Sequence, residues 1–327
     1  MRRGAVTIKE RRMPSQVFVV DLGGTKCSAA TVDRSGRILR RSTLPVDLTS
    51  ASGPIRQICQ LAREFAGEQG PAKAFAAAAI SVPGLVEKNG TVWAPNLPGW
   101  KRIPLAKRLK QSLGLPFAVE SDRNATILGE SWHGAARGKS DAIVLMLGTG
   151  IGAGILSGGH IIRGAHELSG CAGWMTITRE EVQDAPQLGE LESLVAGPAI
   201  ARIARQRLLK GGQSSLSRLD LAKITAHDVA AAARQHDPLA LDIFNKSGRL
   251  LGFAVANLVS LFDPEIVVLG GGMAAVADLY LGSLRRAMLE RAQPLAARRV
   301  KIVVSKLGPK ANLLGCARLA WGSLARA

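Results

Sequence analysis

The feature that most constrains this chain is a strand, a glycine turn and a second strand, which occur in the same order twice. Residues 17–32 (VFVVDLGGTKCSAATV) combine an apolar strand, a Gly-Gly turn and a strand in which apolar residues alternate. Residues 142–157 (AIVLMLGTGIGAGILS) repeat these signals. Two copies of one unit predict two related domains that face each other, and a cleft between such domains is the natural place for a ligand.

Strand and helix signals alternate along the rest of the chain, which indicates an α/β fold. Helices are expected at 53–69, 124–136, 190–210, 226–235 and 238–262. The expected domains are a basic flexible arm at 1–16, an N-terminal α/β domain at 17–122, a C-terminal α/β domain at 123–305 and, at 306–327, a terminal helix that packs back on the N-terminal domain.

The composition excludes several classes of protein. A chain of 327 residues that is 47% hydrophobic can build two domains with cores of their own. The longest apolar run, residues 250–262, is too short to span a bilayer, so no membrane partner is expected. The four cysteines are scattered without a CxxC pair, which favours reduced thiols in the cytoplasm over a disulfide framework.

The formal net charge of +18 has two readings. It could serve an anionic partner such as a nucleic acid, polyphosphate or a nucleotide. It could also be a solvated basic surface, since the arginines and lysines are dispersed and no helix-turn-helix, zinc-finger or aromatic RNA-binding pattern accompanies them. We favour the second reading and expect no specific nucleic acid partner.

Three glycine-rich turns each follow an apolar strand: DLGGTK (21–26), LGTGIGAG (147–154) and LGGG (269–272). Successive N–H groups in such turns form a concave site for an anion, and threonine hydroxyls add donors. None of the turns fits the GxxxxGK[ST] pattern of a P-loop. The residues expected to contact nucleotide phosphates are Asp21, Gly23, Gly24, Thr25, Lys26, Gly148, Thr149, Gly150, Gly152, Gly270, Gly271 and Gly272.

Asp122 lies where an apolar strand ends and a helix begins, in VESDRNATILGE. Aspartate is a good helix N-cap, and this position alone favours that role. The alternative is a general base that takes the proton of a substrate hydroxyl during its attack on phosphorus.

These motifs, together with SVPGLVEKNGTVWAPNLPGW, IIRGAHELSGCAGW, LVAGPAI and LFDPEIVVLGGG, resemble the ROK family of sugar kinases and repressors over residues 17–320. The resemblance implies an actin-like ATPase (ribonuclease H-like) fold, a homodimer, and ATP and Mg²⁺ as cofactors. It further implies that Asp122 is the catalytic base, that Asn96 and Glu192 contact sugar hydroxyls, and that Asp21 organises the Mg²⁺ shell through water.

The stretch GAHELSGCAGW (164–174) departs from the family pattern. Most relatives carry a glutamate and a histidine that hold the sugar, and that histidine also binds a structural zinc. This chain has Cys171 and Trp174 there, and Ser121 replaces an asparagine. His166 and Cys171 are two candidate zinc ligands without partners, because the following segment contains no cysteine, so no protein-bound zinc is expected. The expected substrate-binding residues are Asn96, Ser121, Asp122, Cys171, Trp174 and Glu192, although Trp174 could instead fill the volume of the missing zinc loop.

The expected function is phosphorylation by ATP of a hydroxyl on a hexose or hexose-like substrate, in a glucokinase-like sugar kinase of carbohydrate metabolism with altered sugar specificity. One alternative keeps the enzyme and takes polyphosphate as donor. Another is a catalytically weak sugar-binding regulator. A sequence-reading repressor is not expected, because the first glycine-turn strand already starts at Val17.

Overall fold

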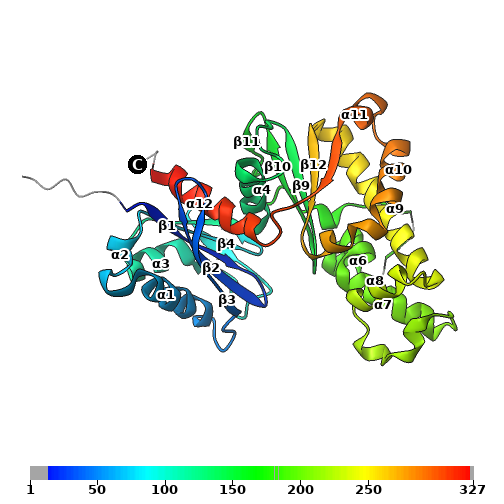
Figure 1. The fold of residues 1–327 in the computed structure, drawn as a ribbon, viewed down its shortest axis with the longest axis horizontal. Coiled ribbons are helices and arrows are strands. Elements are labelled where there is room, and N and C mark those ends of the chain that lie inside the picture. The colour runs from blue at the N-terminus through cyan, green and yellow to red at the C-terminus, as the bar shows by residue number, and fades with distance from the viewer. Residues whose placement is uncertain (1–13, 180, 183, 325–327) are drawn as a thin grey trace, which may run out of the picture. The chain divides into compact units, whose positions relative to one another are not determined.

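The computed structural model describes residues 14–179, 181–182 and 184–324 (Figure 1). Most of the basic arm expected at 1–16 lies outside these residues. The chain divides into two compact units. Among the described residues, unit 1 contains those up to Glu120 together with those from Cys316 onward, and unit 2 is the segment Ser121–Gly315.

Unit 1 is built on a five-stranded sheet with the order β3-β2-β1-β4-β8. Its strands are β1 (Gln16–Leu22), β2 (Lys26–Asp33), β3 (Ile38–Pro45), β4 (Ala78–Val82) and β8 (Phe117–Ser121). β1, β2 and β3 are antiparallel, and β4 pairs with β1 in parallel. A small separate sheet contains β5 (Leu85–Val86), β6 (Thr91–Trp93) and β7 (Ile103–Pro104).

Helices cover both faces of this sheet (Figure 1). α1 (Gly53–Ala66) and α3 (Leu105–Leu113) place their apolar stripes in one core with Phe18 and Val20 of β1, and the short α2 (Pro71–Ala74) follows α1. The part of α12 (Lys310–Leu324) that belongs to unit 1 lies against the sheet as well. The thiol of Cys316 donates to the carbonyl oxygen of Val20 at 3.5 Å, and Trp321 Nε1 donates to that of Asp33 at 3.1 Å.

Unit 2 repeats this strand pattern in a sheet with the order β11-β10-β9-β12-β13. Its strands are β9 (Ala142–Leu147), β10 (Ile151–Ser157), β11 (His160–Ile161), β12 (Ile266–Gly270) and β13 (Lys301–Val304). Again the glycine-turn hairpin is antiparallel and the next strands are parallel. Each of the two glycine hairpins predicted from the sequence therefore forms the same part of its own sheet.

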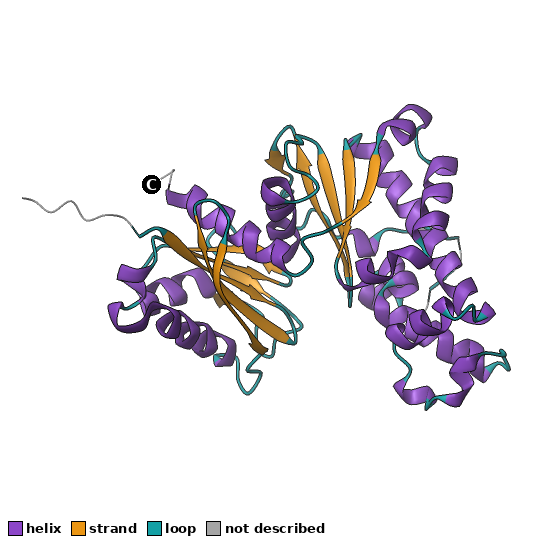
Figure 2. Ribbon diagram, in the orientation of Figure 1, coloured by secondary structure: helices purple, strands orange, loops and turns teal. Residues whose placement is uncertain are grey.

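The two faces of the unit 2 sheet carry different layers (Figure 2). Ile143, Leu145 and Leu147 of β9 face the larger layer, and Ala142 and Val144 alternate toward α4 (Asp122–His133). The larger layer contains α6 (Glu190–Val195), α7 (Gly197–Leu209), α8 (Ala226–Arg234), α9 (Pro238–Phe262), α10 (Leu281–Arg291) and α11 (Pro294–Arg299), with the short α5 (Ala185–Leu188) preceding α6. Within the described residues, no helix is long and apolar enough to cross a membrane.

The expectation of one helix over 190–210 is wrong, because α6 ends before Ala196 and α7 starts at Gly197. Ala196 is extended, and Pro198 occupies the first turn of α7, where its missing N–H costs nothing. Because Gly197 is the first residue of α7, its N–H has no partner within the helix. This N–H donates to the carbonyl oxygen of Gly148 at 2.9 Å. The break therefore joins the start of α7 to a glycine turn.

Candidate active site

The glycine turns of unit 2 meet at the carboxyl ends of the parallel strands β9 and β12. Gly271 has φ +81°, and a Cβ there would collide with the carbonyl oxygen of Leu147, so only glycine fits. A Cβ on Gly148 would lie 3.9 Å from the backbone nitrogen of Gly272. In open α/β sheets, ligands bind at this edge.

These turns border a cavity of about 280 Å³. Its lining consists of glycines, apolar side chains and two polar side chains, and the residues are Gly148, Thr149, Gly197, Pro198, Ala226, His227, Gly272, Met273 and Val276. A nucleobase can pack against the apolar side chains of Met273 and Val276. The N–H groups of glycine turns can donate hydrogen bonds to phosphate oxygens. The cavity therefore fits the adenosine end of a nucleotide.

Sequence reasoning found only part of this lining. Gly148, Thr149 and Gly272 were expected, whereas Gly270 lies inside β12 and does not line the cavity. The only available signal for Gly197 and Pro198 was the motif LVAGPAI. No pattern marked Ala226 or His227, which α8 brings in from a distant part of the chain.

Glu192 lies over the first residues of β10. Its Oε2 accepts the N–H of Ile151 at 2.7 Å, and a Cβ on Gly150 would lie 2.9 Å from the same oxygen. Burial raises the pKa of Glu192, and the hydrogen bond from Ile151 acts in the opposite direction. Gly150 thus makes room for a carboxyl group, in addition to any contact with phosphate.

Asp122 is the first residue of α4, and the N-cap is Ser121. The Oγ of Ser121, which is 3% exposed, accepts the N–H of Asn124 at 3.4 Å. Asp122 Oδ1 accepts the N–H of Arg123 at 2.8 Å. The capping alternative for Asp122 is therefore wrong, because the neighbouring hydroxyl has that role.

Arg123 was missed by sequence reasoning, although a charged residue directly after Asp122 was a visible signal. Its Nη1 donates to Cys171 Sγ at 2.9 Å. A Cβ on Gly152 would lie 2.8 Å from Arg123 Cδ, so the glycine leaves the path of this side chain open. Two charged side chains therefore pack against the start of β10: Glu192 lies against Gly150, and Arg123 lies against Gly152.

Cys171 is held in place by the residue before it. Gly170 has φ +82°, its carbonyl oxygen accepts the N–H of Ala153 at 2.7 Å, and a Cβ would collide with Ala153. Trp174, three residues further on, is 57% exposed and does not fill an interior volume. His166 is also exposed, and in the part of the chain that the structure describes no three His, Cys, Asp or Glu side chains are grouped to hold a metal ion.

In unit 1, the turn between β1 and β2 and the loop that carries Asn96 lie next to each other. The N–H of Gly23 donates to the carbonyl oxygen of Lys26 at 2.8 Å, and a Cβ on Gly24 would lie 3.9 Å from Asn96 Cβ. Asn96 is exposed, on a loop anchored by the buried Trp100, whose Nε1 donates to the carbonyl oxygen of Ala51 at 2.9 Å. Thr25 and Lys26 are also exposed.

Asp21 lies at the end of β1, beside this turn. Its Oδ1 accepts the hydroxyl of Ser81 at 2.8 Å. Burial, and secondarily the charge of Asp21, raise the pKa of the Cys27 thiol to about 12. Cys27 therefore stays a neutral thiol. The carboxylate of Asp21 is an oxygen ligand of the kind that a divalent cation prefers.

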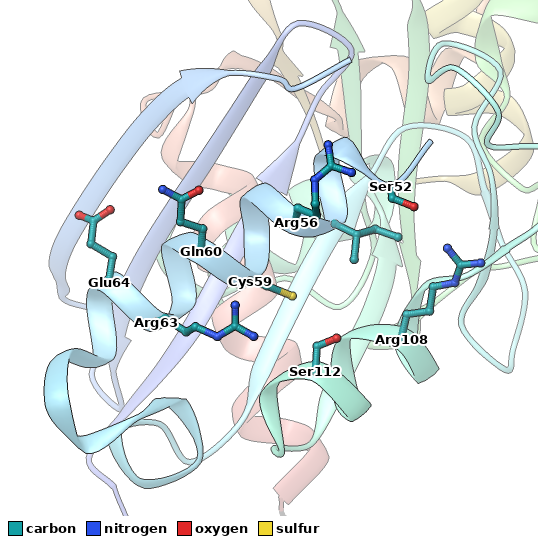
Figure 3. Close-up of a pocket in the computed structure, with 9 residues that line it drawn as sticks. Ser52, Arg56, Cys59, Gln60, Arg63, Glu64, Arg108 and Ser112 are labelled. Carbon is teal, nitrogen blue, oxygen red and sulfur yellow. The ribbon is translucent and has the colours of Figure 1, made fainter. Parts of the chain in front are cut away.

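A larger cavity, of about 680 Å³, lies in unit 1 along α1 and α3 (Figure 3). Figure 3 shows Arg63 and Arg108 on either side of Ser112. The third arginine of its lining, Arg56, pairs with Asp47 at 3.3 Å. None of the sequence-predicted site residues lines this cavity, so its size does not make it the candidate active site.

Comparisons with known proteins agree on one family. The family model described as "ROK family" matches residues 17–322. A glucokinase of Thermotoga maritima is 32% identical over 307 residues, which cover 92% of this chain and 95% of that protein.

Solved structures give the same result. A ROK family glucokinase from Streptomyces griseus in complex with glucose and AMPPNP is 31% identical, with a TM-score of 0.76 over 94% of this chain and 99% of that one. A ROK family transcriptional regulator, homolog of E. coli MLC protein, has a TM-score of 0.83 at 25% identity and covers 93% and 77% of the two chains. The fold is the actin-like ATPase fold expected from the sequence, and enzymes and regulators share it.

Proposed function

Because this chain belongs to the ROK family, we propose that it is a kinase that transfers the γ-phosphoryl group of ATP to a hydroxyl of a hexose or hexose-like substrate. The observation that carries this proposal is the meeting of the turns after β9 and β12 with the start of α7 around one cavity. Kinase chemistry needs little from a protein except positioning and charge stabilisation, and these turns supply both.

In this proposal the cavity holds the adenosine, and the turn at 148–150, whose Gly148 and Thr149 line the cavity, contacts the phosphates. Residues 23–26 of unit 1 remain proposed phosphate contacts. A Mg²⁺ ion in such sites is held by one or two carboxylates together with phosphate oxygens and water, so the single carboxylate of Asp21 fits. When bound, this ion neutralises part of the phosphate charge.

Asp122 is the general base. Its carboxylate takes the proton of the substrate hydroxyl while that oxygen forms the new bond to phosphorus and ADP leaves. The N-cap hydrogen bond made by Ser121 supports this assignment, because the start of the helix needs no cap from Asp122.

Asn96 and Glu192 bind hydroxyls of the substrate, while Cys171 and Trp174 replace the glutamate and histidine that most relatives use. A site that loses two hydroxyl partners changes its substrate choice strongly, because an unmatched buried polar group is costly. Glucose is therefore a poor substrate. The family resemblance supports a homodimer, and the four free cysteines support a cytoplasmic location. The dispersed basic residues support the absence of a specific nucleic acid partner.

Substitution of the base tests the proposal. ADP release is measured across glucose, mannose, their N-acetyl and amino forms, and cyclitols, with polyphosphate in place of ATP as a second donor arm scored by phosphorylated product. Asp122→Asn is expected to lower kcat at least about 100-fold with nucleotide binding little changed.

Asp220→Asn, at an exposed cap in unit 2, is the matched control and is expected to behave as the wild type. Activity of Asp122→Asn within a few-fold of the wild type would remove Asp122 from the role of base. Binding of sugar without turnover of any donor would favour the regulator.

A further inference from the structure

The guanidinium of Arg123 lies among poorly matched partners. Its Nη1 donates to Cys171 Sγ, and its buried Nε has no hydrogen-bond partner. Among the described residues, no carboxylate forms an ion pair with it. A thiol is a weak acceptor, and a buried donor without a partner is costly.

Arg123 is fixed in this place rather than free to turn into solvent. Gly152 leaves room for its aliphatic stem, and the Gly170 turn holds Cys171 at its tip. It also follows Asp122 directly on α4. The guanidinium is therefore held beside Cys171, on the residue that directly follows the proposed base.

The side chain at Cys171 is a thiol, which accepts hydrogen bonds only weakly. The Arg123 guanidinium reaches this position with a positive charge and N–H donors. An arginine fork matches a planar carboxylate with two parallel hydrogen bonds, which a neutral hydroxyl cannot accept in the same way.

We propose that Arg123 binds a carboxylate of the substrate, so that the preferred acceptor is a sugar acid rather than a neutral hexose. This inference rests on the proposed kinase function. Cys171 positions the guanidinium, and Glu192, which lies at Gly150, remains the partner of a hydroxyl.

Matched pairs of acceptors test the inference: glucuronate against glucose, galacturonate against galactose, and gluconate against glucitol. A glucose 6-phosphate arm separates a carboxylate from a phosphate as the recognised anion, and its preference over every sugar acid would overturn the carboxylate assignment. In the best pair, kcat/KM is expected to be at least about tenfold higher for the acid, the usual size of a charge-assisted hydrogen bond.

Variants of the guanidinium make the test specific. Arg123→Gln is expected to lower the acid-to-neutral ratio at least about tenfold, through KM rather than kcat, and Arg123→Lys should keep part of the preference. Cys171→Glu should also lower the ratio, because the new carboxylate pairs with Arg123. Arg137→Gln, which removes an exposed arginine just after α4, is the control and should leave the ratio unchanged.

Calorimetric binding of the same acceptors without nucleotide separates this inference from the kinase proposal. Binding of a sugar acid that depends on Arg123, without turnover, would support the inference and contradict the kinase. Turnover that depends on Asp122, with an acid-to-neutral ratio equal in wild type and Arg123→Gln, would overturn the inference and leave the kinase intact. If sugar acids bind no better than neutral sugars, the inference is also wrong.

Discussion

Burial and a hydrogen bond act on the carboxyl group of Glu192 in opposite directions. Burial has the larger effect and raises its pKa, while the N–H of Ile151 stabilises the charged form. This glutamate therefore takes up a proton at a higher pH than an exposed one. The proposed hydroxyl contact would therefore lose its charged acceptor at a higher pH than a contact to an exposed glutamate.

The pH dependence of KM and of melting checks this account. We expect KM for the acceptor to rise as the pH falls through the raised pKa, and Glu192→Gln, which keeps an acceptor for Ile151, to lose this dependence. Because folding favours the protonated form, the contribution of Glu192 to stability is present at low pH and lost as the pH rises through its folded pKa. Glu192→Gln should therefore melt higher than the wild type at neutral pH and level with it at low pH; an equal difference at every pH would contradict the account.

The roles of individual site residues could be predicted from the sequence to different degrees. Asp122 could be found because strand, carboxylate and helix follow one another along the chain. Arg123 could not, since its role depends on where the side chain points. That direction is set by the space at Gly152 and by the Gly170 turn, which are remote in sequence.

The turn after β12 depends on one glycine more than on its neighbour. Gly271 has φ +81° and lies against the backbone of Leu147, whereas a Cβ on Gly272 would meet nothing within 4 Å. A side chain at Gly271 would push apart the two turns that border the nucleotide cavity. The three consecutive glycines of LGGG are therefore not equivalent, although their sequence is uniform.

Paired substitutions test this difference. Gly271→Ala is expected to lower the free energy of unfolding by about 1–3 kcal/mol, the usual cost of a strained backbone position, and to weaken nucleotide binding. Gly272→Ala should leave the melting temperature unchanged. Denaturant unfolding and calorimetry measure both effects, and equal destabilisation by the two variants would contradict the assignment.

Among the elements, those with a long periodic pattern were predicted well and the short ones were not. The helices α1 and α9 were expected close to their observed positions. The strands β5, β6 and β7 have two or three residues each, too few for any period to show. The break between α6 and α7 was missed because it serves a hydrogen bond to Gly148, a contact that no local pattern contains.

At the scale of the whole molecule, we expect folding without zinc. His166 is exposed, and Cys171 accepts a hydrogen bond from Arg123. Metal analysis should find well under one zinc per chain, and a chelator should leave the melting temperature unchanged. A chelator that lowers it, with recovery on addition of zinc, would show that a metal site exists after all.

The α/β class and the duplicated plan were predictable at this scale, because a repeated hairpin needs only local signals that occur twice. The matching strand orders of the two sheets confirm that inference. The return of the terminal helix to the N-terminal domain was expected as well, although no local pattern encodes it, since it depends on contacts between residues such as Cys316 and Val20.

This return of the terminal helix has a consequence for biosynthesis. Strand β1 leaves the ribosome before any part of unit 2, yet the helix that buries Cys316, Ala317 and Ala320 against unit 1 is translated after the whole of unit 2. Unit 2 is one uninterrupted segment and can complete its core while unit 1 still lacks a layer. Domains usually finish in the order in which they emerge. In this protein the N-terminal sheet begins first and is completed last, so a nascent chain that stalls before residue 316 exposes an unfinished sheet to aggregation.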